Sequence, residues 1–292
     1  MKYIILDLEW NNVYNKRAGS FLNEILQIGA VLLDSSFNVV DTFQVTVKSA
    51  LTKKLSNKVI KLTGITNEDM LKGVSLSQAV NMYNEWSPDR SITMTWSTSD
   101  LYAIVENSRA FELKNTIKIS KYLDLQTYVQ GELKSMGFQI NNQISLSNAA
   151  LMLDISTSEF ELHTAKDDSL VAALILKKTY NNERFPLNIK DTSAKDFYKR
   201  LTFKAYYIKD VRDKRIDPEY LKFHCPVCNF IADRKGKWKF FSNWHRASFF
   251  CKNCNTKLKA MISFRQTYDK LTVKKRILPV VIKESEKEDV KV

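Results

Sequence analysis

The 292-residue sequence has no apolar run long enough for a membrane-spanning helix, and it contains only four cysteines. A membrane span needs about 20 consecutive apolar residues, and the N-terminus has no signal-peptide cleavage pattern. These absences exclude a membrane protein and predict a cytoplasmic one. Apolar residues make up 44% of the chain and charged residues 26%, which is typical of a folded protein and not of a disordered one.

The net charge of +13 belongs to the last third of the chain. Residues 1–180 contain 18 Lys and Arg against 19 Asp and Glu, whereas residues 181–292 contain 27 against 13. A compact segment this basic usually binds a polyanion, most often nucleic acid. A lysine-rich surface that serves only solubility is the alternative.

The first ten residues combine a buried strand pattern with two acids. Tyr3–Leu8 is apolar on both faces, as a central strand is when both of its faces are covered. Asp7 and Glu9 are two residues apart, so a strand directs both to the same face. Because two such carboxylates repel each other, we expect a divalent cation to stabilise them. Two surface acids at a frayed strand end are the alternative.

The following segments predict a mixed sheet covered by helices. Residues 24–33 and 39–47 have strand patterns, and residues 11–22 are polar and predict a loop. Three antiparallel strands are therefore followed by alternating strands and helices, and this order favours an α/β fold with helices on both faces of the sheet.

Further acids occur where strands end or helices begin. Asp100 follows a short strand at 91–96 and lies in the first turn of a predicted helix. His163, Asp167 and Asp168 stand at the start of a strongly apolar helix that runs to residue 176. Four carboxylates with a nearby histidine are the groups that metal-assisted phosphodiester hydrolysis requires.

Three segments resemble the motifs of the DEDDh 3′→5′ exonucleases, which include RNA-trimming enzymes and the DNA polymerase epsilon-subunit type. They are Asp7-Leu-Glu9, Trp96-Ser-Thr-Ser-Asp100 and His163-Thr-Ala-Lys-Asp-Asp168, and two weaker motifs lie at 62–66 and 147–150. The resemblance covers roughly residues 1–180. It implies an RNase H-like fold, two Mg²⁺ or Mn²⁺ ions, and release of nucleoside monophosphates from a 3′ end.

The resemblance also implies a role for each site residue. Asp7, Glu9, Asp100 and Asp168 would hold the metal ions, and His163 would be the general base. The family spacing selects Asp168 over Asp167. Many relatives have Thr where this chain has Trp10, which bears on how the terminal nucleotide is held. Trp10 and Trp96 are candidates for stacking on that nucleotide, with a place in the core as the alternative.

All four cysteines lie in two Cys-x-x-Cys motifs in the basic third. Cys225, Cys228, Cys251 and Cys254 are arranged as two pairs separated by 22 residues. This layout predicts a structural zinc site with four thiolate ligands, and disulfides are the weaker explanation in a reducing compartment.

Cations and aromatic rings alternate between the two cysteine pairs, which is typical of single-stranded nucleic-acid binding. The alternative is that the rings form the core of a small ribbon. The better contact candidates are Lys235, Lys237, Trp238 and Lys239.

The sequence thus predicts two functional parts. We expect an exonuclease domain at 1–182, a basic connector at 183–220, a zinc-ribbon-like nucleic-acid-binding domain at 221–268 and a charged tail at 269–292. The predicted activity is 3′→5′ hydrolysis of single-stranded RNA. A DNA exonuclease of the proofreading or repair type and a catalytically silent nucleic-acid-binding protein are the alternatives.

Overall fold

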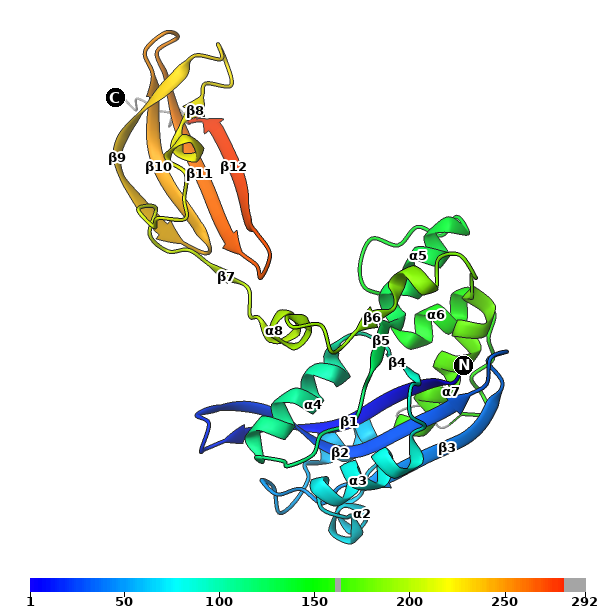
Figure 1. Ribbon diagram of the computed structural model, residues 1–292. Coiled ribbons are helices and arrows are strands. Elements are labelled where there is room, and N and C mark those ends of the chain that lie inside the picture. The colour runs from blue at the N-terminus through cyan, green and yellow to red at the C-terminus, as the bar shows by residue number, and fades with distance from the viewer. Residues whose placement is uncertain (161–163, 281–292) are drawn as a thin grey trace, which may run out of the picture. The chain divides into compact units, whose positions relative to one another are not determined.

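The computed structural model describes residues 1–160 and 164–280, and the chain falls into two compact units, 1–201 and 202–292. No helix among the described residues is long and apolar enough to span a membrane. The first unit contains a sheet with the strand order β3-β2-β1-β4-β5-β6 (Figure 1). Its strands are β1 (Tyr3–Asn15), β2 (Ser20–Leu33), β3 (Val39–Thr46), β4 (Ile92–Thr95), β5 (Lys121–Asp124) and β6 (Lys190–Asp191).

Neighbouring strands in this sheet run in both directions. The β1–β2, β2–β3 and β5–β6 pairs are antiparallel, whereas β1–β4 and β4–β5 are parallel. The predicted mixed sheet is therefore confirmed. The helices of this unit are α1 (Asn57–Thr63), α2 (Asn67–Lys72), α3 (Leu76–Trp86), α4 (Ser99–Ala110), α5 (Leu125–Ser135), α6 (Leu146–Met152), α7 (Ala165–Thr179) and the 3₁₀ helix η1 (Pro186–Asn188). Helix α8 (Phe197–Thr202) ends at the first residue of the second unit.

Strand β1 supplies the core on both faces of the sheet, as its apolar pattern predicts. Tyr3 and Ile5 pack with residues of α5, α6 and α7, whereas Ile4, Leu6 and Leu8 pack with residues of α3 and α4. All five side chains are buried. Helices therefore cover both faces of the sheet, and the acids of β1 continue the alternation that these apolar residues begin.

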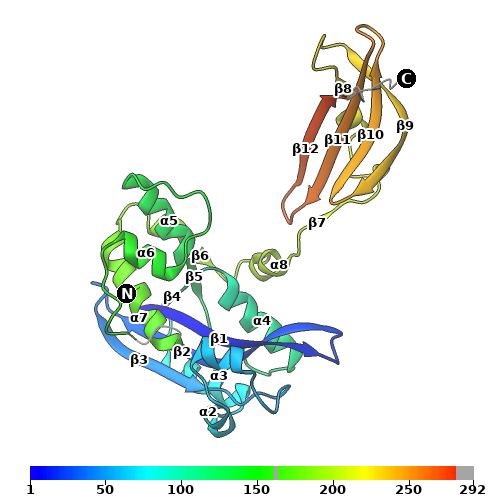
Figure 2. The ribbon, with the colours of Figure 1, turned by 180° about the vertical axis from the view of Figure 1, so that it is seen from behind.

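Two expectations about the chain were wrong. Residues 11–22, which were expected to form a loop, mostly belong to a long β1–β2 hairpin whose paired residues run to Asn15 and Ser20 (Figure 2). Leu271–Pro279, which was expected in a charged tail, forms strand β12 and pairs with β11 (Thr256–Gln266). Both segments are polar on at least one face, so their extended conformation depends on a neighbouring strand more than on their own apolar pattern.

The second unit is built on a sheet with the order β12-β11-β10-β9-β8, in which β7 also pairs with β11. Buried residues from β8 to β11 form a separate core, which includes Phe223, Phe249 and Phe264. The elements are β7 (Tyr206–Tyr207), the 3₁₀ helix η2 (Pro218–Leu221), β8 (Phe223–His224), β9 (Ile231–Phe241), β10 (Trp244–Cys251), β11 (Thr256–Gln266) and β12 (Leu271–Pro279).

Candidate active site and zinc centre

Asp7 and Glu9 lie on one face of β1, directly opposite two unusual residues of β2. Asp7 pairs with Gly29 and Glu9 pairs with Gln27. The acids follow Tyr3 and Ile5 on the face that α7 covers, because side chains alternate along a strand. Both carboxylates therefore point toward the start of α7.

Gly29 and Gln27 bring the start of α7 against the sheet. A Cβ atom at Gly29 would lie 2.3 Å from the backbone carbonyl carbon of Ala165, so only glycine permits this approach. The Ala165 amide donates to Oε1 of Gln27 at 3.1 Å. Sequence reasoning missed both residues. Their signal is a glutamine and a glycine within an otherwise buried apolar strand, where a glycine often marks a close backbone approach.

Helix α7 then presents its first turn to the acids of β1. Thr164 caps the helix by accepting a hydrogen bond from the Asp167 amide at 3.3 Å. Of the two adjacent acids in this turn, Asp168 joins Asp7 and Glu9 in a group whose ligand oxygen atoms all lie within 4.8 Å of one another.

Asp100 approaches the same place from helix α4. It lies in the first turn of α4, and its side chain is buried. Its Oδ1 atom accepts a hydrogen bond from the Leu8 amide at 3.2 Å. Strand β4 pairs with β1 only along Tyr3–Ile5, so the Leu8 amide lies beyond that pairing and Asp100 takes the place of a strand partner.

Three of these carboxyls have pKa values above their ordinary range, mainly because they are buried. Desolvation raises the pKa of Asp7 well above its usual range, and the charges of Asp100, Asp168 and Glu9 raise it further. Desolvation and the charge of Asp168 raise the pKa of Glu9 to about 8. Desolvation also raises the pKa of Asp100 to about 7, against the lowering effect of its hydrogen bond from Leu8.

The donor set fits divalent cations that prefer oxygen ligands. Carboxylates this close together are costly as anions unless a positive charge lies among them, and Mg²⁺ and Mn²⁺ bind carboxylate oxygens. His163 lies outside the described residues, immediately before the cap of α7.

The two tryptophans occupy different surroundings. Trp96 packs on the core that includes α7, and its indole Nε1 donates to the Ile144 carbonyl at 3.2 Å. Trp10 packs on the core of the opposite face of the sheet, away from Asp7 and Glu9. Asp124, another acid at a strand end, caps α5 by accepting from the Thr127 amide at 3.0 Å.

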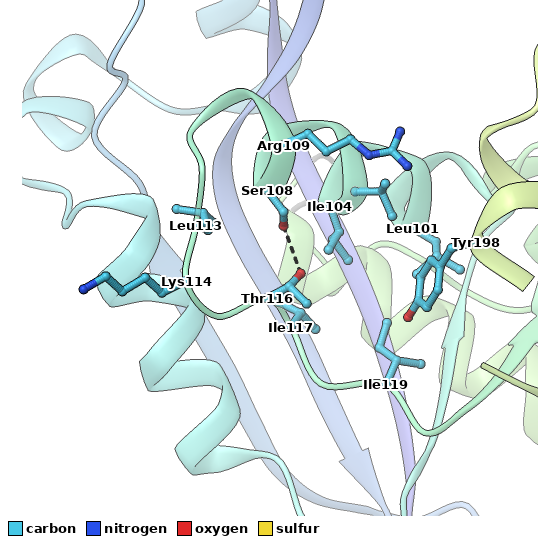
Figure 3. A pocket seen from close by; sticks show the side chains of 11 residues that line it. Leu101, Ile104, Ser108, Arg109, Leu113, Lys114, Thr116, Ile117, Ile119 and Tyr198 are labelled. Carbon is cyan, nitrogen blue, oxygen red and sulfur yellow. Dashed lines mark hydrogen bonds between the residues drawn. The ribbon is translucent and has the colours of Figure 1, made fainter. Parts of the chain in front are cut away.

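An apolar hollow lies elsewhere in the first unit, between α4, the segment 113–119 and Tyr198 (Figure 3). Its volume is about 370 Å³, and Leu101, Ile104 and Ile119 contribute to its wall. The four acids are absent from its lining residues. It is therefore distinct from the acid cluster.

The four cysteines converge in the second unit. Their sulfur atoms all lie within 4.8 Å of one another, with Cys225 Sγ 3.6 Å from Cys254 Sγ and Cys228 Sγ 3.3 Å from Cys251 Sγ. Zn–S bonds of about 2.3 Å in a tetrahedron place sulfurs about 3.8 Å apart, whereas a disulfide requires about 2.05 Å. The cluster therefore fits a zinc ribbon.

Each cysteine pair is followed by an asparagine in the left-handed backbone conformation. Asn229 and Asn255, which follow the second cysteine of each pair, have φ of 61° and 55°. In the first turn the Asn229 amide donates to the Cys225 carbonyl at 2.9 Å. The backbone N–H of Phe230 lowers the pKa of Cys228 to about 6, which favours the thiolate that a metal ion binds.

The predicted contact residues of the second unit divide between its two sides. Lys235, Lys237 and Lys239 are exposed on β9. Trp238 is half-buried, with its ring centroid 5.7 Å from Phe249 and 6.0 Å from Phe223. Trp238 therefore packs on the core of this unit.

The family model for exonucleases, RNase_T, matches residues 4–176, which is more than half of the chain. The chain is therefore a member of this exonuclease family. Comparison with the curated proteins gives no significant match.

Solved structures with the same fold include DEDDh 3′-exonucleases. The nuclease domain of 3′hExo, a DEDDh family member bound to rAMP, is 21% identical with a TM-score of 0.52, and the match covers 61% of this chain and 90% of that one. A 3′-exonuclease that recognises the 3′ end of a histone mRNA stem-loop is 18% identical with a TM-score of 0.51, covering 64% and 84%.

Cell-death related nuclease 4 is 20% identical with a TM-score of 0.52, and the match covers 61% of this chain and 62% of that one. The chain thus spans less than two thirds of the length of that protein. At these identities the likeness shows the fold, and the RNase H-like fold expected from the sequence is confirmed.

Proposed function

We propose that this protein is a divalent-metal-dependent 3′→5′ exonuclease that hydrolyses single-stranded RNA and releases nucleoside 5′-monophosphates. The observation that carries the proposal is the convergence of Asp7, Glu9 and Asp168 within 4.8 Å, with Asp100 close enough for its charge to raise the pKa of Asp7. These acids come from β1, α4 and α7, so the folded chain is needed to assemble them.

Asp7, Glu9, Asp100 and Asp168 would hold two Mg²⁺ or Mn²⁺ ions. Such ions activate the attacking water and stabilise charge on the attacking and leaving oxygen atoms. Asp100 is oriented by the Leu8 amide, and Asp168 is oriented by the packing of α7 on Gly29 and Gln27. His163 would accept the proton of the attacking water, because imidazole titrates near neutral pH.

The preference for RNA follows from the motifs and from relatives. The exonuclease motifs resemble those of RNA-trimming members, and two structures of the same fold hold rAMP or recognise an mRNA stem-loop. The second unit would hold structural zinc through its four cysteines and add affinity for the substrate through its cations.

A gel assay tests this proposal. Single-stranded RNA and DNA of the same sequence, each labelled at the 5′ end, are incubated with Mn²⁺, with Mg²⁺ and without added divalent cation. The expected result is a cation-dependent ladder that shortens from the 3′ end, faster for RNA. A faster ladder on DNA would favour the DNA exonuclease. No ladder from folded, zinc-loaded protein would contradict the enzyme and favour a silent binding protein.

A further inference from the structure

The sheet of the second unit has one face that is covered and one, called here the open face, that no other described segment covers. On β10 the covered side chains are His245, Ala247, Phe249 and Cys251, which are buried. The intervening side chains are at least partly exposed and point the other way. They are Trp244, Arg246, Ser248 and Phe250.

The strand register extends the open face across four strands, which lie side by side in Figure 1. Residues directly opposite each other in neighbouring strands share a face. Arg246 pairs with Lys239 and with Met261, and Met261 pairs with Arg276. Ser248 pairs with Lys235 and with Lys259. The cations on this face include Lys235, Lys239, Arg246, Lys257, Lys259, Lys274 and Arg276.

The centre of the open face is hollowed. The hollow has a volume of about 650 Å³. Its lining residues include Lys235, Lys237, Lys239, Phe241, Arg246 and Lys259. Five of these six side chains are cationic, so the hollow attracts anions.

Aromatic rings accompany the cations on this face. The guanidinium of Arg246 lies 5.3 Å from the ring centroid of Phe241, and that of Arg276 lies 5.3 Å from the ring of Trp244. The Lys235 ammonium lies 6.0 Å from the ring of Phe250. The Phe241 side chain is 65% exposed, which leaves ring surface available to a ligand.

Acids are nearly absent from the four strands. Asp233 is the one Asp or Glu in β9–β12, and it forms an ion pair with Lys252 at 2.7 Å. The positive potential of the open face is therefore little reduced by its own strands.

We propose that the open face of β9–β12 binds the backbone and bases of single-stranded nucleic acid. Lys239, Arg246 and Lys259 contact phosphates, while Phe241 and Trp244 stack with bases. An acidic protein segment would use the cations but has no flat bases for the rings, so the aromatic component favours nucleic acid. This inference deepens the proposed function, on which it rests for the identity of the polymer.

The test is a binding titration with the full chain carrying Asp7→Asn to prevent hydrolysis. A 5′-fluorescein-labelled 20-nucleotide poly(U) RNA is titrated by anisotropy at several KCl concentrations. For Lys239→Ala with Lys259→Ala we expect the slope of log affinity against log salt to shrink by about 1.4, and affinity at 0.1 M salt to fall about 25-fold, because each phosphate contact on a single strand contributes about 0.7 to the slope. Phe241→Ala should weaken binding several-fold and leave the slope unchanged.

The matched control is Lys214→Ala with Lys270→Ala, which removes two exposed cations of the same unit outside the open face. Equal losses in the two double variants would show a general charge effect and overturn the proposal. Equal competition by poly-glutamate of the same length would overturn the nucleic-acid assignment. Hydrolysis of a dinucleotide by the wild-type protein is measured separately, and its absence would contradict the proposed activity without affecting the binding comparison.

Discussion

At the residue scale, the surroundings of the acid cluster favour protonated, neutral carboxyls when no cation is bound. Burial and neighbouring charge raise the pKa of Glu9 to about 8, and burial raises the pKa of Asp100 to about 7. Because a metal ion binds the deprotonated form of a carboxyl, metal binding at this cluster would release protons.

Replacing Asp7 by Asn should lower the rate of hydrolysis by at least about 100-fold, because loss of even an outer-shell partner of a metal site costs about 10–100-fold. RNA binding without divalent cation should change by less than about twofold, since no phosphate contact is removed. Single-turnover kinetics and anisotropy measure the two effects.

Asp124→Asn is the control for that substitution. Asp124 also ends a strand of the sheet, but it caps α5, and Asn caps helices about as well as Asp. Both stability and activity should be retained. Near-normal hydrolysis by the Asp7 variant would remove Asp7 from the metal site.

A second residue-scale prediction concerns pH. A carboxyl with a raised pKa in the folded state contributes stability that is fully present below its unfolded pKa of about 4 and is lost as pH rises through its folded pKa. Without divalent cation, the melting temperature of the first unit should therefore fall between pH 5 and 8.5, by about 2–4 °C for each kcal/mol lost.

Added Mn²⁺ should raise that melting temperature more at pH 8.5 than at pH 5, because the ligands must be deprotonated. Glu9→Gln should reduce both the pH dependence and the Mn²⁺ effect. Calorimetry at fixed ionic strength measures them. A melting temperature that rises with pH in the absence of cation would contradict the sign argued from the cluster.

At the element scale, the placement of α7 on β2 determines whether Asp168 reaches the other acids. Gly29→Ala would put a methyl group 2.3 Å from backbone atoms of Ala165 and Lys166. We expect a loss of about 1–3 kcal/mol in the free energy of unfolding and a fall in activity that exceeds the unfolded fraction, since the helix start must move away from Asp7.

Gly131→Ala provides the contrast within α5. A Cβ at Gly131 meets nothing within 4 Å, so this change should stabilise the protein by about 0.5–1 kcal/mol and leave activity alone. Urea unfolding with parallel rate measurements checks both variants. Full activity in a folded Gly29→Ala protein would show that α7 does not set the geometry of the site.

Elements that carry their own apolar pattern could be predicted, and those that depend on distant partners could not. The first six residues of β1, the first turn of α4 and the start of α7 follow from local sequence. The far half of the β1–β2 hairpin and strand β12 could not be predicted from local sequence. Their polar residues, such as Asn11, Asn12 and Lys274–Arg276, favour a strand only beside a paired neighbour.

The same distinction applies to the site. The motifs indicated the acids, whereas the role of Gln27 and Gly29 became visible only once β2 was paired with β1 and α7 packed on it. Their contribution comes from contacts with residues about 140 positions later in the chain, which short-range periodicity does not contain.

At the scale of the whole molecule, the chain consists of two compact units with separate cores. We expect Cys251→Ser to release zinc, unfold the second unit and weaken RNA binding with a flatter salt dependence. Hydrolysis of a dinucleotide should fall much less than hydrolysis of a 20-nucleotide RNA. Zinc content, anisotropy and rates on both substrates measure this, and equal losses on both would show that catalysis requires the second unit.

Strand β1 has a consequence for how such a protein can change during evolution. Insertion of one residue between Ile5 and Asp7 would turn both acids to the opposite face of the sheet, so the proposed metal site requires this segment to keep its length. The turn at residues 16–19, between β1 and β2, carries no such constraint. We therefore expect relatives of this protein to differ in length at the tip of the hairpin, while the first nine residues keep their spacing.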